Sequence, residues 1–174
     1  MTSELQFGFK AKASTSQCTF VLKEALAYYV DNKSSVYCAF LDATKAFDRV
    51  NYCKLFRLLV KRNLPPLLLR VMLNSYISNF VRVSWSGYFS EYFLAKNGVK
   101  QGGMLSPVLF CVYLDELLHT LSAAKVRCYV GDLFVGALAY ADDIVLTAPS
   151  ATALRKMLAM RCLWLRVFYE FQCS

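Results

Sequence analysis

The sequence lacks any apolar run long enough to cross a membrane. Its two densest apolar stretches, MLSPVLFCVYLDELL and MLAMRCLWLRVFY, are broken by Ser, Pro, Asp or Arg before the roughly 18 residues that a membrane span needs. No signal peptide is visible, because Met1 leads into TSELQFGFK, which contains no apolar core. We therefore expect no membrane partner.

Histidine is nearly absent, and the cysteines do not form a metal-binding or disulfide pattern. There are seven cysteines, an odd number, with no CxxC pair and mostly apolar neighbours. This pattern predicts reduced core residues of an intracellular protein, cytoplasmic or nuclear, and argues against a disulfide framework or a zinc site. The single histidine, His119, lies in the helical pattern LDELLHTL and is expected on a helix surface.

Internal repeats, low-complexity segments and linkers are absent as well. The chain has 174 residues, of which 57% are hydrophobic, and this composition argues against disorder. The length is that of about one domain with a sizeable core.

Acidic residues are scarce in one part of the chain. Residues 44–100 contain ten Lys and Arg but only Asp48 and Glu91, so the whole net charge of +8 arises there. Such a local excess is typical of a surface that binds a polyanion such as a nucleic acid. An ordinary solvated basic face explains the charge equally well, so both interpretations stay open.

The hydrophobic pattern predicts a mixture of helices and strands. We expect helices over 16–31, 51–63, 67–77 and 105–121 and a last helix capped by Ser150, with Lys54, Arg57 and Lys61 forming a basic stripe on the second. Strands are predicted at 35–42 (buried), in a hairpin turning near residues 86–87, and over 127–148 with turns between them. This order favours an α+β fold in which helices cover a sheet.

Two adjacent carboxylates interrupt the apolar run ALAYADDIVLTA at residues 137–148. Burying Asp142 and Asp143 in such a run is costly unless a positive charge lies beside them. From a regular strand they would point to opposite faces, so they serve one site only from a tight turn. Asp42 ends another apolar strand, CAFLD, so the strand ends can assemble a cluster suited to Mg²⁺ or Mn²⁺. Alternatively, Asp42 caps a turn and the other two occupy a polar hairpin tip.

Four segments together resemble the reverse transcriptase domain of non-LTR (LINE-type) retrotransposons. QFGFKAKASTSQCTFVLKEAL resembles the finger-side segment of that family, and FLDATKAFDRVN its first palm motif. NGVKQGGMLSPVLFCVYLDEL resembles the motif that positions template and nucleotide, and LAYADDIVLTA the catalytic hairpin. The four occur in the order and with the spacing of the family, which makes the resemblance more specific than YADD alone.

The resemblance implies which residues hold the metal ions. Asp42 and Asp142 correspond to the two metal-bridging carboxylates, Asp143 to the neighbouring acid, and the backbone carbonyl of Ala43 to a further ligand. Asp48 is assigned instead to a local cap or salt bridge. Two divalent ions, Mg²⁺ or Mn²⁺, activate the primer 3′-hydroxyl and stabilise the leaving pyrophosphate in such a mechanism.

The resemblance also implies residues that contact nucleotide and template. Phe47 corresponds to the aromatic residue that stacks under the incoming sugar and excludes a ribose 2′-hydroxyl, although its periodicity alone predicts a core residue. Gln101 and Gly102 correspond to residues beside the nucleotide and template, with a surface loop as the alternative for Gln101. Ser106 and Pro107 correspond to the start of the helix that supports them.

The implied fold is a polymerase palm with partial fingers, in which helices back an antiparallel sheet. Residues 1–34 are expected to be the finger-side segment and 35–174 the palm, with the upstream basic segment and the thumb absent. The implied reaction is RNA-directed addition of dNTPs to a DNA primer on an RNA template.

Two other functions stay open. Because the flanking segments are not recognisable, the chain can instead be an inactive remnant that at most binds nucleic acid weakly. A metal-dependent nuclease would use the same carboxylates, but it would have no need for the nucleotide-positioning motif.

Overall fold

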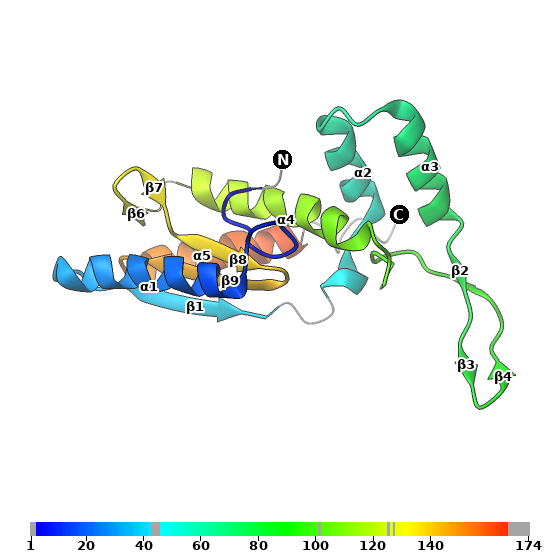
Figure 1. Ribbon diagram of the computed structural model, residues 1–174, viewed down its shortest axis with the longest axis horizontal. Coiled ribbons are helices and arrows are strands. Elements are labelled where there is room, and N and C mark those ends of the chain that lie inside the picture. Colours follow the sequence, from blue (N-terminus) through cyan, green and yellow to red (C-terminus); the bar gives the residue numbers. More distant parts are fainter. Residues whose placement is uncertain (1–2, 43–45, 101, 125, 127, 167–174) are drawn as a thin grey trace. The chain divides into compact units, whose positions relative to one another are not determined.

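The computed structural model describes residues 3–42, 46–100, 102–124, 126 and 128–166 (Figure 1). It contains two compact units, one formed by Met1–Thr44 with Leu114–Ser174 and the other by Lys45–Tyr113. Helix α4 (Ser106–Ala123) begins in the second unit and ends in the first. The two units are described in turn.

The first unit is built on a three-stranded antiparallel sheet. Its strands are β1 (Tyr37–Leu41), β9 (Asp143–Ala148) and β8 (Ala137–Tyr140), in the order β1–β9–β8. The central strand β9 pairs with β1 through Leu41 and Ile144 and with β8 through Tyr140 and Asp143. A single parallel bridge between Gln6 and Ala139 sets the N-terminal segment against the other edge of β8. The α+β class and the antiparallel sheet are confirmed.

Helices α1 (Thr15–Asp31) and α5 (Ala151–Arg166) run along this sheet (Figure 1). A capping box starts α1, in which the Ser14 hydroxyl accepts from the Gln17 amide N–H and the Gln17 side chain accepts from the Ser14 amide N–H. Ser150 caps α5, as predicted, by accepting from the Ala153 N–H at 3.2 Å. α1 contacts β8, whereas α5 contacts β9 and β1.

The core of this unit is densest along β9. Every residue of Ile144–Ala148 is buried, because β9 is the central strand. On the side of α1, Val145 packs with Leu138 and Cys18. Thr147 is also buried, and its hydroxyl donates to the Val135 carbonyl at 2.6 Å, so no hydroxyl is left unsatisfied there. Two short strands, β6 (Tyr129–Val130) and β7 (Leu133–Phe134), form a separate hairpin before β8.

The second unit is mainly helical. It contains the short 3₁₀ helix η1 (Phe47–Arg49), α2 (Tyr52–Lys61) and α3 (Pro66–Ile77). Asn51 caps α2 by accepting from the Lys54 N–H at 3.0 Å, and Pro66 lies in the first turn of α3, where its missing N–H costs no hydrogen bond. Four strands of two residues each follow: β2 (Phe80–Val81), β3 (Ser84–Trp85), β4 (Tyr88–Phe89) and β5 (Phe93–Leu94).

The predicted basic stripe on α2 is wrong at one position. Arg57 and Lys61 are exposed as expected, but Lys54 is only 8% exposed. Its ammonium group lies 5.0 Å from the centroid of the Tyr113 ring, a cation–π contact that helps to stabilise the charge away from water. The apolar stripe is confirmed, because Leu55, Leu58 and Leu59 are all buried.

The expectation of a buried strand at 35–42 is also wrong. The strand exists as β1, but Phe40 is 75% exposed and no residue of β1 is fully buried. The cause is its position at the edge of the sheet, which an apolar run does not distinguish from a central position.

The prediction for the cysteines is only partly confirmed. In the described part of the chain, Cys18, Cys111 and Cys128 are buried thiols, whereas Cys53 and Cys162 are exposed. Burial raises the pKa of the Cys18 thiol, which lowers its thiolate population and its reactivity. His119 is exposed on α4, as predicted. Among the described helices, none is both long and apolar enough to span a bilayer.

Candidate active site

The pairing of β1 with β9 brings Asp42 to the turn that carries Asp142 and Asp143. Leu41 pairs with Ile144 in an antiparallel register, so the next residue along β1, Asp42, follows beside Asp143. Asp142 lies in the turn between Tyr140 and Asp143, which pair with each other. Figure 1 shows the end of β1 and the β8–β9 turn at the same end of the sheet. Three acids from two distant segments of the sequence therefore lie at the same end of the sheet.

The predicted tight turn is present. Residues Ala141 and Asp142 form a two-residue loop, and Ala141 has φ of +57°. The turn lets both Asp142 and Asp143 lie at this end of the sheet, since Asp142 is in the loop and Asp143 is the first residue of β9. The expected burial is wrong, because Asp42 and Asp143 are exposed and Asp142 is half-buried. The apolar neighbours of the acids belong to the strands, and the acids themselves lie at their ends.

The three carboxylates have the donor chemistry of a magnesium site. Within the described part of the chain, no hydrogen bond or ion pair joins Asp42, Asp142 or Asp143 to another side chain. The described part of the chain contains no group of three or more His, Cys, Asp or Glu side chains arranged closely enough to hold a metal ion by themselves. Mg²⁺ is usually held by one or two carboxylates together with substrate phosphates, so two acids suffice. Ala43, the predicted backbone ligand, lies outside the described residues.

Phe47 belongs to the second unit and is fixed by the loop that follows β5. Its ring stacks on Phe110 of α4, with centroids 4.5 Å apart and an interplanar angle of 16°. Its carbonyl accepts from the Val99 N–H at 2.8 Å, and Val50 accepts from Gly98 at 2.9 Å. Phe47 is half-buried. The first palm motif and the start of NGVKQGG thus contact each other.

Ser106 anchors the rest of this loop at the start of α4. It is 3% exposed, and its hydroxyl donates to the carbonyl of Lys100. Its own N–H donates to the Gly103 carbonyl at 3.1 Å. Gly102 is exposed with φ of +77° and open space where a Cβ would lie, a conformation that favours glycine. Gln101, predicted to lie beside the nucleotide, is outside the described residues.

Gln6 also contributes to the site, although the sequence pattern did not single it out. This residue is 1% exposed, and its side-chain amide contacts both the N–H and the carbonyl of Ala141, each at 3.1 Å. The family resemblance places the segment QFGF only on the finger side of the fold. A single polar residue between apolar ones gives no signal of its partner, so the contact with the turn could not be predicted.

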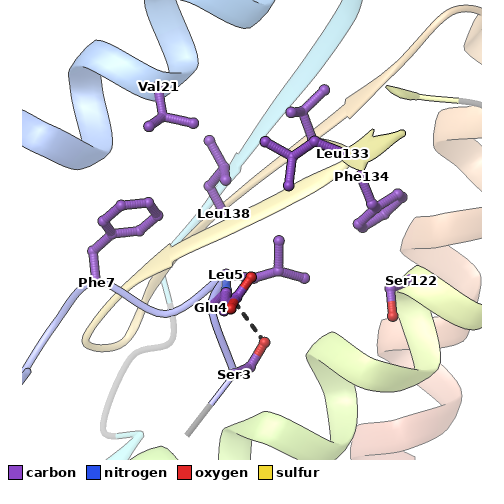
Figure 2. A pocket seen from close by; sticks show the side chains of 10 residues that line it. Ser3, Glu4, Leu5, Phe7, Val21, Ser122, Leu133, Phe134 and Leu138 are labelled. Carbon is purple, nitrogen blue, oxygen red and sulfur yellow. Dashed lines mark hydrogen bonds between the residues drawn. The ribbon is translucent and has the colours of Figure 1, made fainter. Parts of the chain in front are cut away.

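A pocket of about 450 Å³ lies elsewhere in the first unit (Figure 2). Its lining is mostly apolar, with Leu5, Phe7, Val21 and Leu138 among the side chains drawn in Figure 2. None of the three predicted catalytic acids lines it. Glu4 contributes one carboxylate to its lining, whereas three acids lie together at the β8–β9 turn, so the candidate site is the end of the sheet at that turn.

Comparison with protein families identifies the chemistry of the relatives. The family model described as reverse transcriptase (RNA-dependent DNA polymerase) matches residues 1–171. The chain is 36% identical over 124 residues to the Pol polyprotein of the type-2 retrotransposable element R2DM of Drosophila melanogaster, covering 71% of this chain and 12% of that protein. It is 33% identical over 150 residues to the probable RNA-directed DNA polymerase from transposon X-element of the same organism, covering 84% and 15%. It thus spans less than a sixth of these relatives.

Solved structures share the fold. Apo telomerase from Candida tropicalis superposes with a TM-score of 0.62 at 17% identity, over 84% of this chain and 31% of that one. Telomerase from Candida albicans, solved with a TWJ fragment of telomeric RNA, gives a TM-score of 0.66 at 12% identity, over 90% and 29%. At these identities the likeness concerns the fold alone, and it agrees with the predicted palm-like arrangement of helices and antiparallel sheet.

Proposed function

Since the chain belongs to the reverse transcriptase family, as found in non-LTR retrotransposons, we propose that it synthesises DNA on an RNA template. The reaction adds dNTPs to the 3′ end of a DNA primer. The observation that carries the proposal is the pairing of β1 with β9, which sets Asp42 beside the turn of Asp142 and Asp143. Asp42 and Asp143 are exposed and Asp142 is half-buried, which leaves these acids accessible to a substrate.

Asp42 and Asp142 are the residues that we propose to hold two Mg²⁺ or Mn²⁺ ions, with Asp143 and the Ala43 carbonyl in support. Hard oxygen ligands without an ion-pair partner in the described part of the chain fit such ions. When bound, the ions supply activation of the primer hydroxyl and stabilisation of the charge that develops on the phosphates. The protein contributes position, because phosphoryl transfer needs little covalent chemistry from side chains.

Phe47, Gln101 and Gly102 are the residues that we propose to select the nucleotide. The Phe47 ring stacks on Phe110, and we assign it to exclude a ribose 2′-hydroxyl by shape. Gly102 has no side chain to obstruct a base pair, and we assign Gln101 to contact with nucleotide or template. Ser106 keeps the loop attached to α4 through its bond to Lys100.

The basic residues of 44–100 are proposed to contact the phosphates of the template–primer duplex. Arg57, Lys61 and Arg70 are exposed on α2 and α3. Contacts of this kind are largely independent of sequence and weaken as salt rises.

The deciding experiment is primer extension on an RNA template with Mg²⁺ or Mn²⁺. We compare the purified chain with Asp42→Asn and Asp142→Asn, and use Asp132→Asn as a control because Asp132 is exposed in the β6–β7 turn. Loss of one metal-binding carboxylate removes several kcal/mol of transition-state stabilisation. The rate of primer extension by Asp42→Asn and by Asp142→Asn should therefore fall by about 10³-fold or more. Asp132→Asn should retain full activity, and circular dichroism should show all four proteins folded.

Undiminished extension by Asp42→Asn or Asp142→Asn would refute the assignment of the site. No extension by the folded, unmutated chain would favour the second candidate, a protein that binds nucleic acid without synthesis. The exposed basic residues of 44–100 favour that alternative. It predicts salt-sensitive retention of an RNA–DNA duplex that is unaffected by Asp142→Asn.

A further inference from the structure

Gln6 is a buried polar residue whose side-chain oxygen and nitrogen both bond to main-chain groups. Its Oε1 accepts from the Gly8 N–H at 2.8 Å and from the Ala141 N–H at 3.1 Å, and its Nε2 donates to the Ala141 carbonyl at 3.1 Å. The orientation of the amide follows from its partners, because the reversed amide would set its NH₂ group against two N–H donors. One side chain therefore satisfies both hydrogen-bonding groups of Ala141.

The residue that Gln6 holds has an unusual backbone conformation. Ala141 has φ of +57°, in the left-handed region that a residue with a Cβ disfavours, and it lies directly before Asp142. Such a conformation persists where the surroundings fix it. Here the amide of Gln6 fixes both sides of the Ala141 residue, and with them the direction in which the chain enters Asp142.

The segment around Gln6 is itself fastened to β8. The Phe7 N–H donates to the Ala139 carbonyl and the Ala139 N–H donates to the Leu5 carbonyl, both at 2.8 Å. Figure 2 shows this segment, from Ser3 to Phe7, beside β8. These bonds prevent Gln6 from sliding along the strand.

Gly8 fits the same arrangement. A Cβ on Gly8 would lie 2.2 Å from the Ala141 nitrogen and 2.8 Å from its Cα, so only a residue without a side chain lets the segment approach the turn this closely. Gln6 supplies the hydrogen bonds, and Gly8 supplies the space.

We propose that Gln6 is a positioning residue for the catalytic turn, which it holds through the main chain of Ala141. The inference rests on the proposed function, in that the turn carries the catalytic Asp142. The side-chain amides of Gln and Asn carry a donor and an acceptor on one planar group, as this contact requires, and Gln has the longer reach. Gln6 touches no reacting atom, and its effect on synthesis is exerted through the position of the Asp142 carboxylate.

The test compares Gln6→Ala with Gln17→Ala in the 174-residue chain. Gln17→Ala is the matched control, because it removes a side-chain acceptor in the same unit, at the start of α1, without touching the turn. Hydrogen exchange read by NMR follows the amides of Gly8, Ala141 and Ile144–Ala148. We expect Gln6→Ala to speed exchange at Gly8 and Ala141 by at least tenfold relative to the control, with the β9 amides unchanged.

Primer extension supplies the functional readout. Gln6→Ala should lower kcat by about tenfold or more while the affinity for the primer–template duplex, measured directly, stays within twofold of the unmutated chain. Gln17→Ala should leave kcat unchanged. If Gln6 only stabilised the fold, Gln6→Ala and Gln17→Ala would show the same decrease in kcat when compared at the same loss of stability.

Unchanged exchange at Ala141 in Gln6→Ala overturns the proposal, as does a kcat equal to that of Gln17→Ala. If the unmutated chain extends no primer, the proposed function fails while hydrogen exchange still decides whether Gln6 holds the turn. The two failures are therefore distinguishable.

Discussion

The β8–β9 and β3–β4 hairpins both reverse the chain with a two-residue loop, yet their surroundings are opposite. The β8–β9 hairpin turns at Ala141 and Asp142, and the β3–β4 hairpin turns at Ser86 and Gly87. In the first, β9 is buried from Ile144 to Ala148, whereas in the second Trp85 is 79% exposed. The first belongs to a three-stranded sheet, and the second pairs only with itself.

The difference shows what each turn depends on. Ser86 and Gly87 both have positive φ, +47° and +83°, the combination that hairpins of this length adopt by local preference. Ala141 has positive φ without being glycine, and contacts from Gln6 and Gly8 fix it from outside. The exposed hairpin is therefore determined by its own residues and the buried one by its surroundings.

The largest expected contrast concerns the strands. Leu146→Ala should lower the free energy of unfolding by about 2–5 kcal/mol, because Leu146 is fully buried and its truncation leaves a cavity. Trp85→Ala removes a larger side chain but should cost no more than about 0.5 kcal/mol, since that side chain is mostly in water. Urea denaturation followed by circular dichroism measures both. A loss at Trp85 as large as at Leu146 would mean that the exposed hairpin is packed in solution.

A smaller contrast concerns the glycines. Gly8→Ala should cost about 1–3 kcal/mol because the new methyl group meets the backbone of Ala141 at 2.2 Å. Gly87→Ala meets no atom within 4 Å and should cost about 1 kcal/mol from its positive φ alone. In ¹H–¹⁵N spectra, Gly8→Ala should shift the signals of Ala141 and Asp142, and Gly87→Ala should not. If Gly8→Ala left those signals in place, the close approach would be disproved.

The smallest expected effect is that of Ala141→Gly. Glycine removes a left-handed penalty of about 1 kcal/mol and adds about 0.5–1 kcal/mol of unfolded-state entropy, so stability should rise by no more than about 0.5 kcal/mol. Ser86→Gly should behave in the same way. Gln6 contacts only the main chain of Ala141, so the substitution removes none of its hydrogen bonds. A loss of more than about 1 kcal/mol, read by thermal unfolding, would contradict the positive φ of Ala141.

Much of the fold could be predicted, because it depends on local patterns. The capping residues Ser14 and Ser150 and the turn at Ser86 and Gly87 follow from neighbours in the sequence. The place of the tight turn at Asp142 could also be predicted, because two adjacent acids serve one site only from a turn, but the contacts that fix its backbone could not. The adjacency of Asp42 to that turn followed from two apolar strands that each end in an acid.

The parts that could not be predicted depend on distant partners. Lys54 is buried against Tyr113, and no feature of its own helix indicates that ring. Phe40 is exposed because β1 is an edge strand, a property of the sheet order and not of the run itself. Gln6 is paired with a residue more than a hundred positions away. In each case a side chain is determined by a contact that sequence spacing does not encode.

The pairing of β1 with β9 has a consequence for how this chain tolerates insertions and deletions. The position of Asp42 relative to the Asp142 turn depends on how many residues separate each of them from the paired residues Leu41 and Ile144. Deleting one residue within β1 would move Asp42 by about 3.3 Å and turn its side chain to the other face of the sheet. Residues added at the exposed tip beyond Trp85 leave that count unchanged. Length is therefore constrained far more strongly than identity in β1, and hardly at all in the exposed hairpin.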